Sequence, residues 1–231
     1  MLNYSEKFWI FYNELIKLEP KFKIKYKSES LFMKILGWLM FFNPTFMTGF
    51  ITTIGKTVYF PHPDKLKNQS GFHYIGTLAH EFRHVYDNKK WSIGFPLIYM
   101  LPQILAILSL FSILAIWFSL SWLLCLSFLL FLTPIPSPGR KLIEFNGYTM
   151  SLFMYNEFMK NSEINEETRK EKLLISAEQY DKHFTDASYY FMWPFRVVTS
   201  FEDKIEKILS REIIKEDVIY ENMIAAFNKT K

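Results

Sequence analysis

The stretch His80-Glu81-Phe82-Arg83-His84, an HExxH pattern within residues 74–87, decides how the rest of this chain is interpreted. On a helix, positions four residues apart share a face, so the imidazoles of His80 and His84 reach a single metal ion. Glu81 lies at the edge of that face, within reach of a water molecule on the metal. The same pattern also occurs by accident on ordinary surface helices, so the other parts of the chain have to decide between the two interpretations.

The motif belongs to a predicted helix that begins near Phe72 and ends near Asn88. Its apolar residues recur at the spacing of a helix with one face in the core. These residues are Ile75, Leu78, Ala79, Phe82 and Val85. Similar spacing predicts helices at 3–18, 30–42, 142–160, 165–184, 200–211 and 215–227, with Asn165 as an N-cap. Helix 30–42 is apolar enough to touch a membrane surface, although a buried core helix is the commoner explanation.

The convincing β region is residues 46–61, which are rich in β-branched and aromatic side chains and predict a hairpin with its turn at Gly55-Lys56. The second strand, 56–60, is followed by Pro61, and we expect it to be an edge strand. An edge beside a metal helix can bind an extended peptide as an added strand, and a purely structural hairpin is the alternative. The basic segment 21–30 is predicted to be an exposed connector or a short strand.

Length and charge narrow the classes of function. The 231 residues suffice for a substantial core. The net charge of +4 is scattered, and no run of Lys and Arg alternates with aromatic residues, so we expect no nucleic-acid partner. The single cysteine, Cys125, excludes a disulfide framework and a cysteine-based zinc site. The N-terminal segment lacks the layout of a secretory signal, so we expect folding on the cytosolic side.

Residues 91–139 contain no charged side chain, an uncharged block of 49 positions by count. One membrane crossing takes about 20 residues, so the block suffices for two crossings with a tight turn or for one crossing with generous flanks, and we expect residues 95–136 to enter a membrane. Lys89-Lys90 and Arg140-Lys141 flank the block, and basic residues on both sides indicate that both ends stay on the cytoplasmic face. The turn is predicted either at 109–112 or at 119–121, where serines interrupt the apolar run.

Two histidines leave a catalytic zinc ion one protein ligand short, and Glu144 is the strongest candidate for the third. It shares a predicted helix face with Gly147, Tyr148 and Ser151. Glycine inside a helix costs about 1 kcal/mol relative to alanine. A helix packed tightly against the metal helix would need such a small residue one turn from its ligand. The weaker candidates for the third ligand are Glu157 and His183.

The third ligand also constrains the uncharged block. If His80, His84 and Glu144 bind one ion, residues 90 and 140 must lie on the same side of any membrane. A single crossing would separate them, so the block must be a hairpin, a re-entrant loop or a buried element outside the membrane. The flanking basic residues independently favour the hairpin.

The order HExxH, hydrophobic hairpin, glutamate helix resembles the layout of HtpX-like and CAAX-prenyl-protease-like membrane metallopeptidases, over residues 43–158. In that family the glutamate is followed by a small residue three positions later and usually by an Asp four positions later. Here the small residue is Gly147, and Tyr148 stands in place of the Asp. The chain is also similar to uncharacterised phage and bacterial HExxH proteins that share TTIGKTVYFP, LAHEFRHVYD and EFNGYTMSL, which stand here at 52–61, 78–87 and 144–152.

This resemblance implies a gluzincin-type zincin fold. We therefore expect a single domain over residues 1–231 that is mainly α with a small β hairpin or sheet (α+β). The hydrophobic helical hairpin 95–136 would be inserted between the zinc ligands, and residues 161–231 would form a helical C-terminal region.

The predicted function is a zinc metallopeptidase at a membrane, with Zn²⁺ on His80, His84 and Glu144 and with a protein or peptide substrate. Glu81 is the expected general base, and Asp87 is a candidate acceptor for a ligand histidine. Candidate donors to the carbonyl oxygen are Tyr148, Tyr189, Tyr190, His183 and Arg196.

The alternative is a structural protein of a membrane or a virion that keeps the fold without turnover. Glu81 discriminates between the two, because a purely structural metal site has no use for it.

Overall fold

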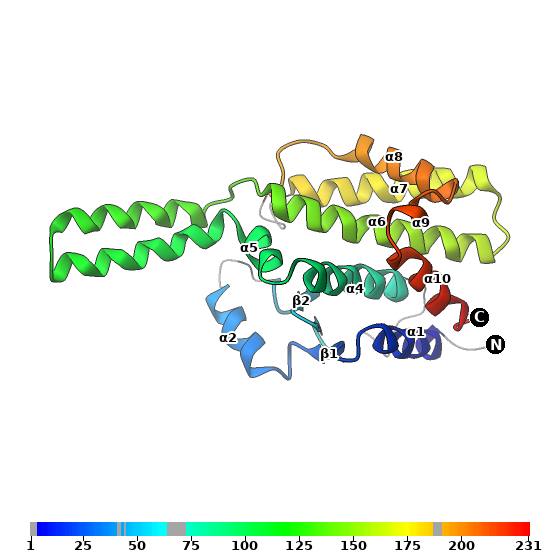
Figure 1. The fold of residues 1–231 in the computed structure, drawn as a ribbon, viewed down its shortest axis with the longest axis horizontal. Helices are drawn as coiled ribbons and strands as arrows, with labels where there is room; N and C mark the ends of the chain where they lie inside the picture. Colours follow the sequence, from blue (N-terminus) through cyan, green and yellow to red (C-terminus); the bar gives the residue numbers. More distant parts are fainter. Residues whose placement is uncertain (1–3, 41–42, 44, 64–72, 187–190) are drawn as a thin grey trace.

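Helix α4, His73–Trp91, runs through the middle of the molecule and carries the HExxH motif (Figure 1). The computed structural model describes residues 4–40, 43, 45–63, 73–186 and 191–231. The described chain is mainly helical with a small three-stranded sheet, which confirms the predicted secondary-structure class. All five apolar positions predicted to face the core from α4 are buried.

Six other helices agree with the predicted ones to within four residues at each described end. They are α1 (Tyr4–Leu18), α2 (Leu31–Leu39), α6 (Pro138–Asn161), α7 (Glu166–Thr185), α8 (Val198–Leu209) and α10 (Ile219–Asn228). The short helices α5 (Gly94–Met100) and α9 (Ile213–Glu216) were not predicted as separate elements. Asn165 is the N-cap of α7, as predicted, and its side chain accepts a hydrogen bond from the amide of Thr168 at 2.9 Å. Two 3₁₀ helices, η1 (Gln103–Ile116) and η2 (Leu120–Leu132), complete the set.

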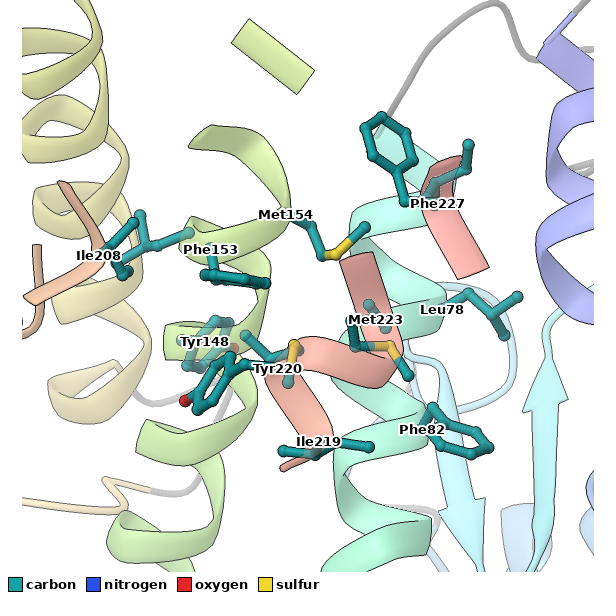
Figure 2. Packing of buried hydrophobic residues seen from close by; sticks show 14 of the residues in the cluster. Leu78, Phe82, Tyr148, Phe153, Met154, Ile208, Ile219, Tyr220, Met223 and Phe227 are labelled. Carbon is teal, nitrogen blue, oxygen red and sulfur yellow. The ribbon is translucent and has the colours of Figure 1, made fainter. Parts of the chain in front are cut away.

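The helices are layered around α4. Helix α1 and the sheet pack on one side of it and α6 on the other, with α7 and α8 beyond α6 (Figure 1). Helix α10 covers the seam between α4 and α6. Figure 2 shows its residues Ile219, Tyr220 and Met223 between Phe153 of α6 and Phe82 of α4, all of them buried. Buried apolar side chains of α10 therefore hold α4 and α6 against each other.

The sheet consists of β1 (Lys23–Tyr26), β2 (Thr52–Ile54) and β3 (Thr57–Phe60) in the order β1-β3-β2. Strands β2 and β3 form the predicted hairpin, with Gly55 at φ 60 in its turn. The prediction that the second hairpin strand is an edge was wrong, because β1 pairs with it in parallel and leaves β3 in the centre. Pro61 follows the last paired residue and removes no hydrogen bond from the ladder. Among the described strands, the edge beside α4 is β2.

The uncharged block forms a finger of two antiparallel helices, η1 and η2, that projects from the body (Figure 1). The turn lies at residues 117–119, at the second of the two predicted places, whereas 109–112 falls inside η1. Over the described residues, no single helix combines the length and apolarity of a membrane crossing. Helices α5 and η1, with axes bent by 86°, together have the length and the apolarity of a membrane crossing.

Lys27, directly after β1, is completely buried. Its Nζ donates a hydrogen bond to the backbone oxygen of Phe46 at 2.6 Å and lies 4.1 Å from the centroid of the Phe46 ring. Burial lowers the pKa of the Lys27 ammonium to about 8, and the charge of Glu81 raises it by a smaller amount. The folded chain therefore holds this proton less tightly than the unfolded chain does.

This difference predicts a pH-dependent stability. Between the folded pKa of about 8 and the ordinary value of 10.5, the unfolded chain binds a proton that the folded chain does not, so the free energy of unfolding rises with pH. Lys27→Met should remove that rise, which amounts to about 3 kcal/mol over the full interval. Chemical denaturation from neutral pH to about 10 measures it. The control Lys25→Met, on an exposed side chain of β1, should keep the wild-type slope. A slope unchanged by Lys27→Met would contradict the expectation.

Candidate metal centre

The centre is built where α6 presses against α4 at Gly147. A Cβ atom added to Gly147 would lie 2.7 Å from Cε1 and Nε2 of His80, closer than real side chains approach. One turn further on, the hydroxyl of Ser151 donates to the backbone oxygen of Gly76 at 3.4 Å. The predicted face of α6 therefore does meet α4, and the glycine is there because the imidazole occupies the space of a side chain.

This contact brings the three predicted ligands together. Nε2 of His80 lies 3.0 Å from Nε2 of His84 and 3.4 Å from Oε2 of Glu144, and His84 Nε2 lies 3.7 Å from the same oxygen. Ligands about 2.0–2.2 Å from a tetrahedral ion are separated by about 3.3–3.6 Å, and the three separations here, 3.0, 3.4 and 3.7 Å, lie within about 0.3 Å of that range. All three side chains are buried, and together they form a group that can hold a metal ion.

The charges of the group favour a cation. Burial raises the pKa of the Glu144 carboxyl, but the imidazoles of His84 and His80 lower it by more, so the pKa lies well below its usual range. Burial lowers the pKa of His84, yet the carboxylate of Glu144 raises it above the ordinary histidine value. The centre thus contains an ionised carboxylate among groups that would otherwise bind a proton, and a bound metal ion would take the place of that proton.

The second oxygen of Glu144 is held by a residue that the sequence interpretation missed. The hydroxyl of Tyr99, in α5, donates to Oε1 of Glu144 at 2.9 Å. Phe95 stacks on Tyr99 with ring centroids 6.3 Å apart and also contacts the ring of His84. The base of the finger is therefore one wall of the centre. The sequence did contain an indication of this role. Tyr99 is the sole tyrosine in the uncharged block, and a tyrosine hydroxyl in apolar surroundings requires a hydrogen-bond partner.

Arg140, near the start of α6, connects the two ends of the finger. Its Nη2 donates to Oε1 of Gln103 at 3.1 Å, and its guanidinium lies 5.3 Å from the centroid of the Tyr99 ring. Gln103 in turn donates to the backbone oxygen of Ile135 at 3.2 Å. These contacts tie the start and the end of the finger to each other and to the residue that holds Glu144.

Glu81 lies beside the centre and is tied to the sheet. Its Oε2 accepts a hydrogen bond of 2.5 Å from the hydroxyl of Thr53 in the edge strand β2. The carboxylate is almost completely buried, and its charge reaches His84, where it contributes to the raised pKa. The HExxH glutamate therefore lies between the group that can hold a metal ion and the edge of β2 that carries no further strand among the described residues.

Asp87 does not act as predicted. It is buried rather than exposed, but its carboxylate accepts from Arg83, through Nε at 3.1 Å and Nη2 at 3.0 Å, and from Asn146. Arg83 also pairs with Asp217 at 3.1 Å, which links α4 to the segment before α10. Within the described chain Nδ1 of His84 is buried without a hydrogen-bond partner. The role of Asp87 is to hold Arg83, not to orient a ligand histidine.

The two alternative third ligands lie elsewhere. Glu157 is near the far end of α6, where Arg211 donates to both its oxygens at 2.9 and 3.0 Å. His183, near the end of α7, is half-buried beside the centre but is not part of the group that can hold the ion. Glu144 is therefore the carboxylate that completes the site.

Among the candidate donors to a carbonyl oxygen, Tyr148 and His183 lie beside the centre. The Tyr148 ring meets His80 edge-on, with centroids 4.7 Å apart, and is stacked near His183 at 5.7 Å. Burial lowers the pKa of His183, so its imidazole is neutral near pH 7. Arg196 instead pairs with the buried Asp181 at 2.8 Å. The two other candidates, Tyr189 and Tyr190, lie outside the described residues.

No family model, curated protein or solved structure matches this chain. The side chains of the centre themselves indicate its chemistry. Two imidazoles and one carboxylate leave the fourth position of a tetrahedral ion open for water, which is the donor set of catalytic rather than structural sites.

The contact at Gly147 predicts the effect of a single added methyl group. Alanine favours a helix by about 1 kcal/mol over glycine, but the overlap with His80 costs about 1–3 kcal/mol and displaces a ligand. Gly147→Ala should therefore lower both the bound metal per chain and the free energy of unfolding. The control is Gly94→Ala, since a Cβ there meets open space. Full metal content and unchanged stability in Gly147→Ala would show that α6 does not approach His80 this closely.

The hydrogen bond from Tyr99 predicts a loss of metal affinity without loss of a ligand. Tyr99→Phe should weaken metal binding about 10–100-fold, because Glu144 would no longer be oriented. Competition with a metal chelator measures this change. The matched control is Tyr86→Phe, which removes a hydroxyl bonded to a different carboxylate, Asp217, at 3.1 Å. Equal affinities for the two variants would mean that Tyr99 has no part in positioning Glu144.

Proposed function

We propose that this chain is a zinc-dependent peptidase attached to a membrane by its finger. The observation that carries the proposal is the position of Glu81. It is a buried carboxylate on the metal helix, outside the ligand group, with one oxygen bonded to the edge strand through Thr53. A purely structural metal site needs no such residue.

The donor set supports zinc in particular. Histidine nitrogens are poor ligands for magnesium and calcium, which bind oxygen, whereas two histidines and a glutamate are a common set for catalytic zinc. No cysteine lies among the ligands, which argues against a closed structural site. The bound ion would be held by His80, His84 and Glu144.

A zinc ion held by His80, His84 and Glu144 would supply Lewis-acid chemistry, polarising the substrate carbonyl and lowering the pKa of a water molecule towards about 7. Glu81 takes the proton of the attacking water and later delivers it to the leaving amine. The hydrogen bond from Thr53 occupies Oε2, which leaves Oε1 for the proton and fixes the orientation of the carboxylate. Tyr148 and His183, on the α6 and α7 side, are the proposed donors to the developing oxyanion.

The proposed substrate is an extended peptide. Strand β2 is paired with β3 on one side, and its other edge carries no strand among the described residues. A peptide added along that edge would form backbone hydrogen bonds with β2 and pass beside Glu81, because Thr53 belongs to that strand. The peptide-binding edge proposed from the structure is therefore β2 rather than the strand expected from the sequence.

The finger supports the membrane part of the proposal. At about 2.0 Å per residue, η1 and η2 are about 26–28 Å long, close to the hydrocarbon thickness of about 30 Å. The aromatic residues Trp117, Phe118 and Trp122 gather at its tip, as they do at membrane interfaces. The basic pairs at 89–90 and 140–141 flank the uncharged block, which supports a cytoplasmic position for the centre.

Two variants distinguish the proposed role of Glu81 as a base from that of Glu144 as a metal ligand. Glu81→Gln should keep about one zinc per chain and lose cleavage of an unfolded test protein by about 10²–10⁴-fold, since the base is gone and the ligands remain. Glu144→Ala should lose the zinc itself. Elemental analysis and a protease assay on the same preparations give both readouts.

The control is Glu157→Ala, which removes a buried carboxylate from the same helix but leaves the ligands intact. It should retain zinc even if it is less stable. Zinc-loaded wild-type protein with no activity on any unfolded protein would favour a structural protein of a membrane or virion. Zinc retained in full by Glu144→Ala would refute the ligand assignment.

A further inference from the structure

Helix α2 presents an apolar stripe to solvent. Of its nine residues only Met33 is fully buried. Leu31 is 72% exposed and Trp38 is 76% exposed. The exposed large apolar residues of α2 are Leu31, Phe32, Ile35, Trp38 and Leu39. At helical spacing these five fall within one arc, so the commoner sequence explanation, a buried core helix, does not hold.

The opposite face of α2 fastens the helix to the body. Ser30 caps its first turn by accepting from the amide of Met33 at 3.3 Å. A Cβ atom at Gly37 would lie 2.7 Å from the sulfur of Met47, so the helix is tightly packed on that side. The orientation of the apolar stripe is therefore set by packing and is not a consequence of a loose helix.

A basic side chain borders this stripe. Lys34 belongs to α2 itself, is exposed and lies at the border of the apolar arc. The segment just before α2 is also basic, since residues 20–30 contain four lysines and one glutamate, and of these lysines only Lys27 is buried. A helix with Trp, Phe and Leu on one side and a lysine at the border of that side has the composition of an interfacial membrane helix.

The position of α2 relates it to the finger. Figure 1 shows α2 at the end of the molecule from which η1 and η2 project, with α5 at the same level. Helix α5 also exposes large apolar residues there, Leu97, Ile98 and Met100. Segments separated by more than fifty residues in sequence thus expose apolar surface at one end of the body.

We propose that α2 lies flat on an anionic lipid bilayer, with its apolar stripe among the acyl chains and Lys34 at the headgroups, next to the inserted finger. Apolar burial and attraction between lysines and anionic lipids act together on such a helix. The proposal rests on the membrane insertion of the finger that forms part of the proposed function, but it does not depend on zinc or on catalysis. A protein groove would also cover the stripe on α2, but it would not account for the position of α2 at the end of the body from which the finger projects.

The depth of labelled cysteines in vesicles tests this proposal. The full chain is reconstituted in vesicles of phosphatidylcholine and phosphatidylglycerol, with an environment-sensitive fluorophore on one cysteine. Lipids with a nitroxide near the headgroup or near the end of the acyl chain serve as quenchers. In a Cys125→Ser background, Leu31→Cys and Trp38→Cys label the two ends of α2. Both labels should be quenched to the same extent, and more strongly by the shallow nitroxide.

Two further labels serve as references. The native Cys125, in η2, reports insertion of the finger. Glu166→Cys labels an exposed side chain at the start of α7, beyond the far end of α6, a helix about 36 Å long by its 24 residues. This label should not be quenched. Replacing phosphatidylglycerol with more phosphatidylcholine should reduce quenching on α2 while that of Cys125 persists.

The outcomes distinguish the two proposals. Quenching at Cys125 without quenching at either α2 label would overturn the α2 inference and leave the finger in the membrane. Unequal quenching of the two α2 labels would show that the helix does not lie flat. A blue-shifted but unquenched α2 label would show that protein, such as a second copy of this chain, covers the stripe. No quenching at Cys125 would refute membrane insertion itself, whatever the zinc content.

Discussion

The contact between the His80 imidazole and the backbone of Gly147 is the constraint on which the rest of this structure depends. It lets α6 approach α4 closely enough for Glu144 to reach the two histidines, and no larger residue at 147 would permit that approach. The other contacts of the body hold the two helices at this distance. Helix α10 packs over their seam, and Arg83 joins α4 to the segment before α10 through Asp217. The geometry of three ligand atoms is thus a consequence of helix packing across the whole molecule.

The finger is part of this arrangement rather than an appendage. It leaves the body just after one pair of ligands and returns just before the third, and its base supplies the hydroxyl that orients Glu144. Tyr99, Gln103 and Arg140 connect both of its ends to the centre. A displacement of the finger would therefore be transmitted to Glu144 through the short helix α5, because Tyr99 of α5 holds its carboxylate.

Local patterns made much of the site predictable. The spacing of His80 and His84 and the oddity of glycine beside Glu144 each depend on the geometry of a single helix, and the helices and their caps follow from residues close in sequence. What could not be predicted depends on pairing between distant segments. For the basic segment 21–30 the sequence left a connector and a short strand both open, and only the pairing of β1 with β3 makes β2 rather than β3 an edge among the described strands. Asp87 was misjudged because Arg83, one turn away, competes for the same carboxylate. For α2, periodicity located an apolar stripe but gave no information about which side would face solvent.

The order of the ligands along the chain has a consequence for how the protein is made. During synthesis the two histidines and Glu81 emerge first, and Glu144 follows only when the entire finger has been translated. A nascent chain therefore contains Glu81 and two of the three residues of the group that can hold a metal ion before the finger has been translated, and the group is complete only after it. The finger also divides the ligands between two parts of the polypeptide. A single cut anywhere between residues 101 and 137 would leave His80 and His84 on one fragment and Glu144 on the other.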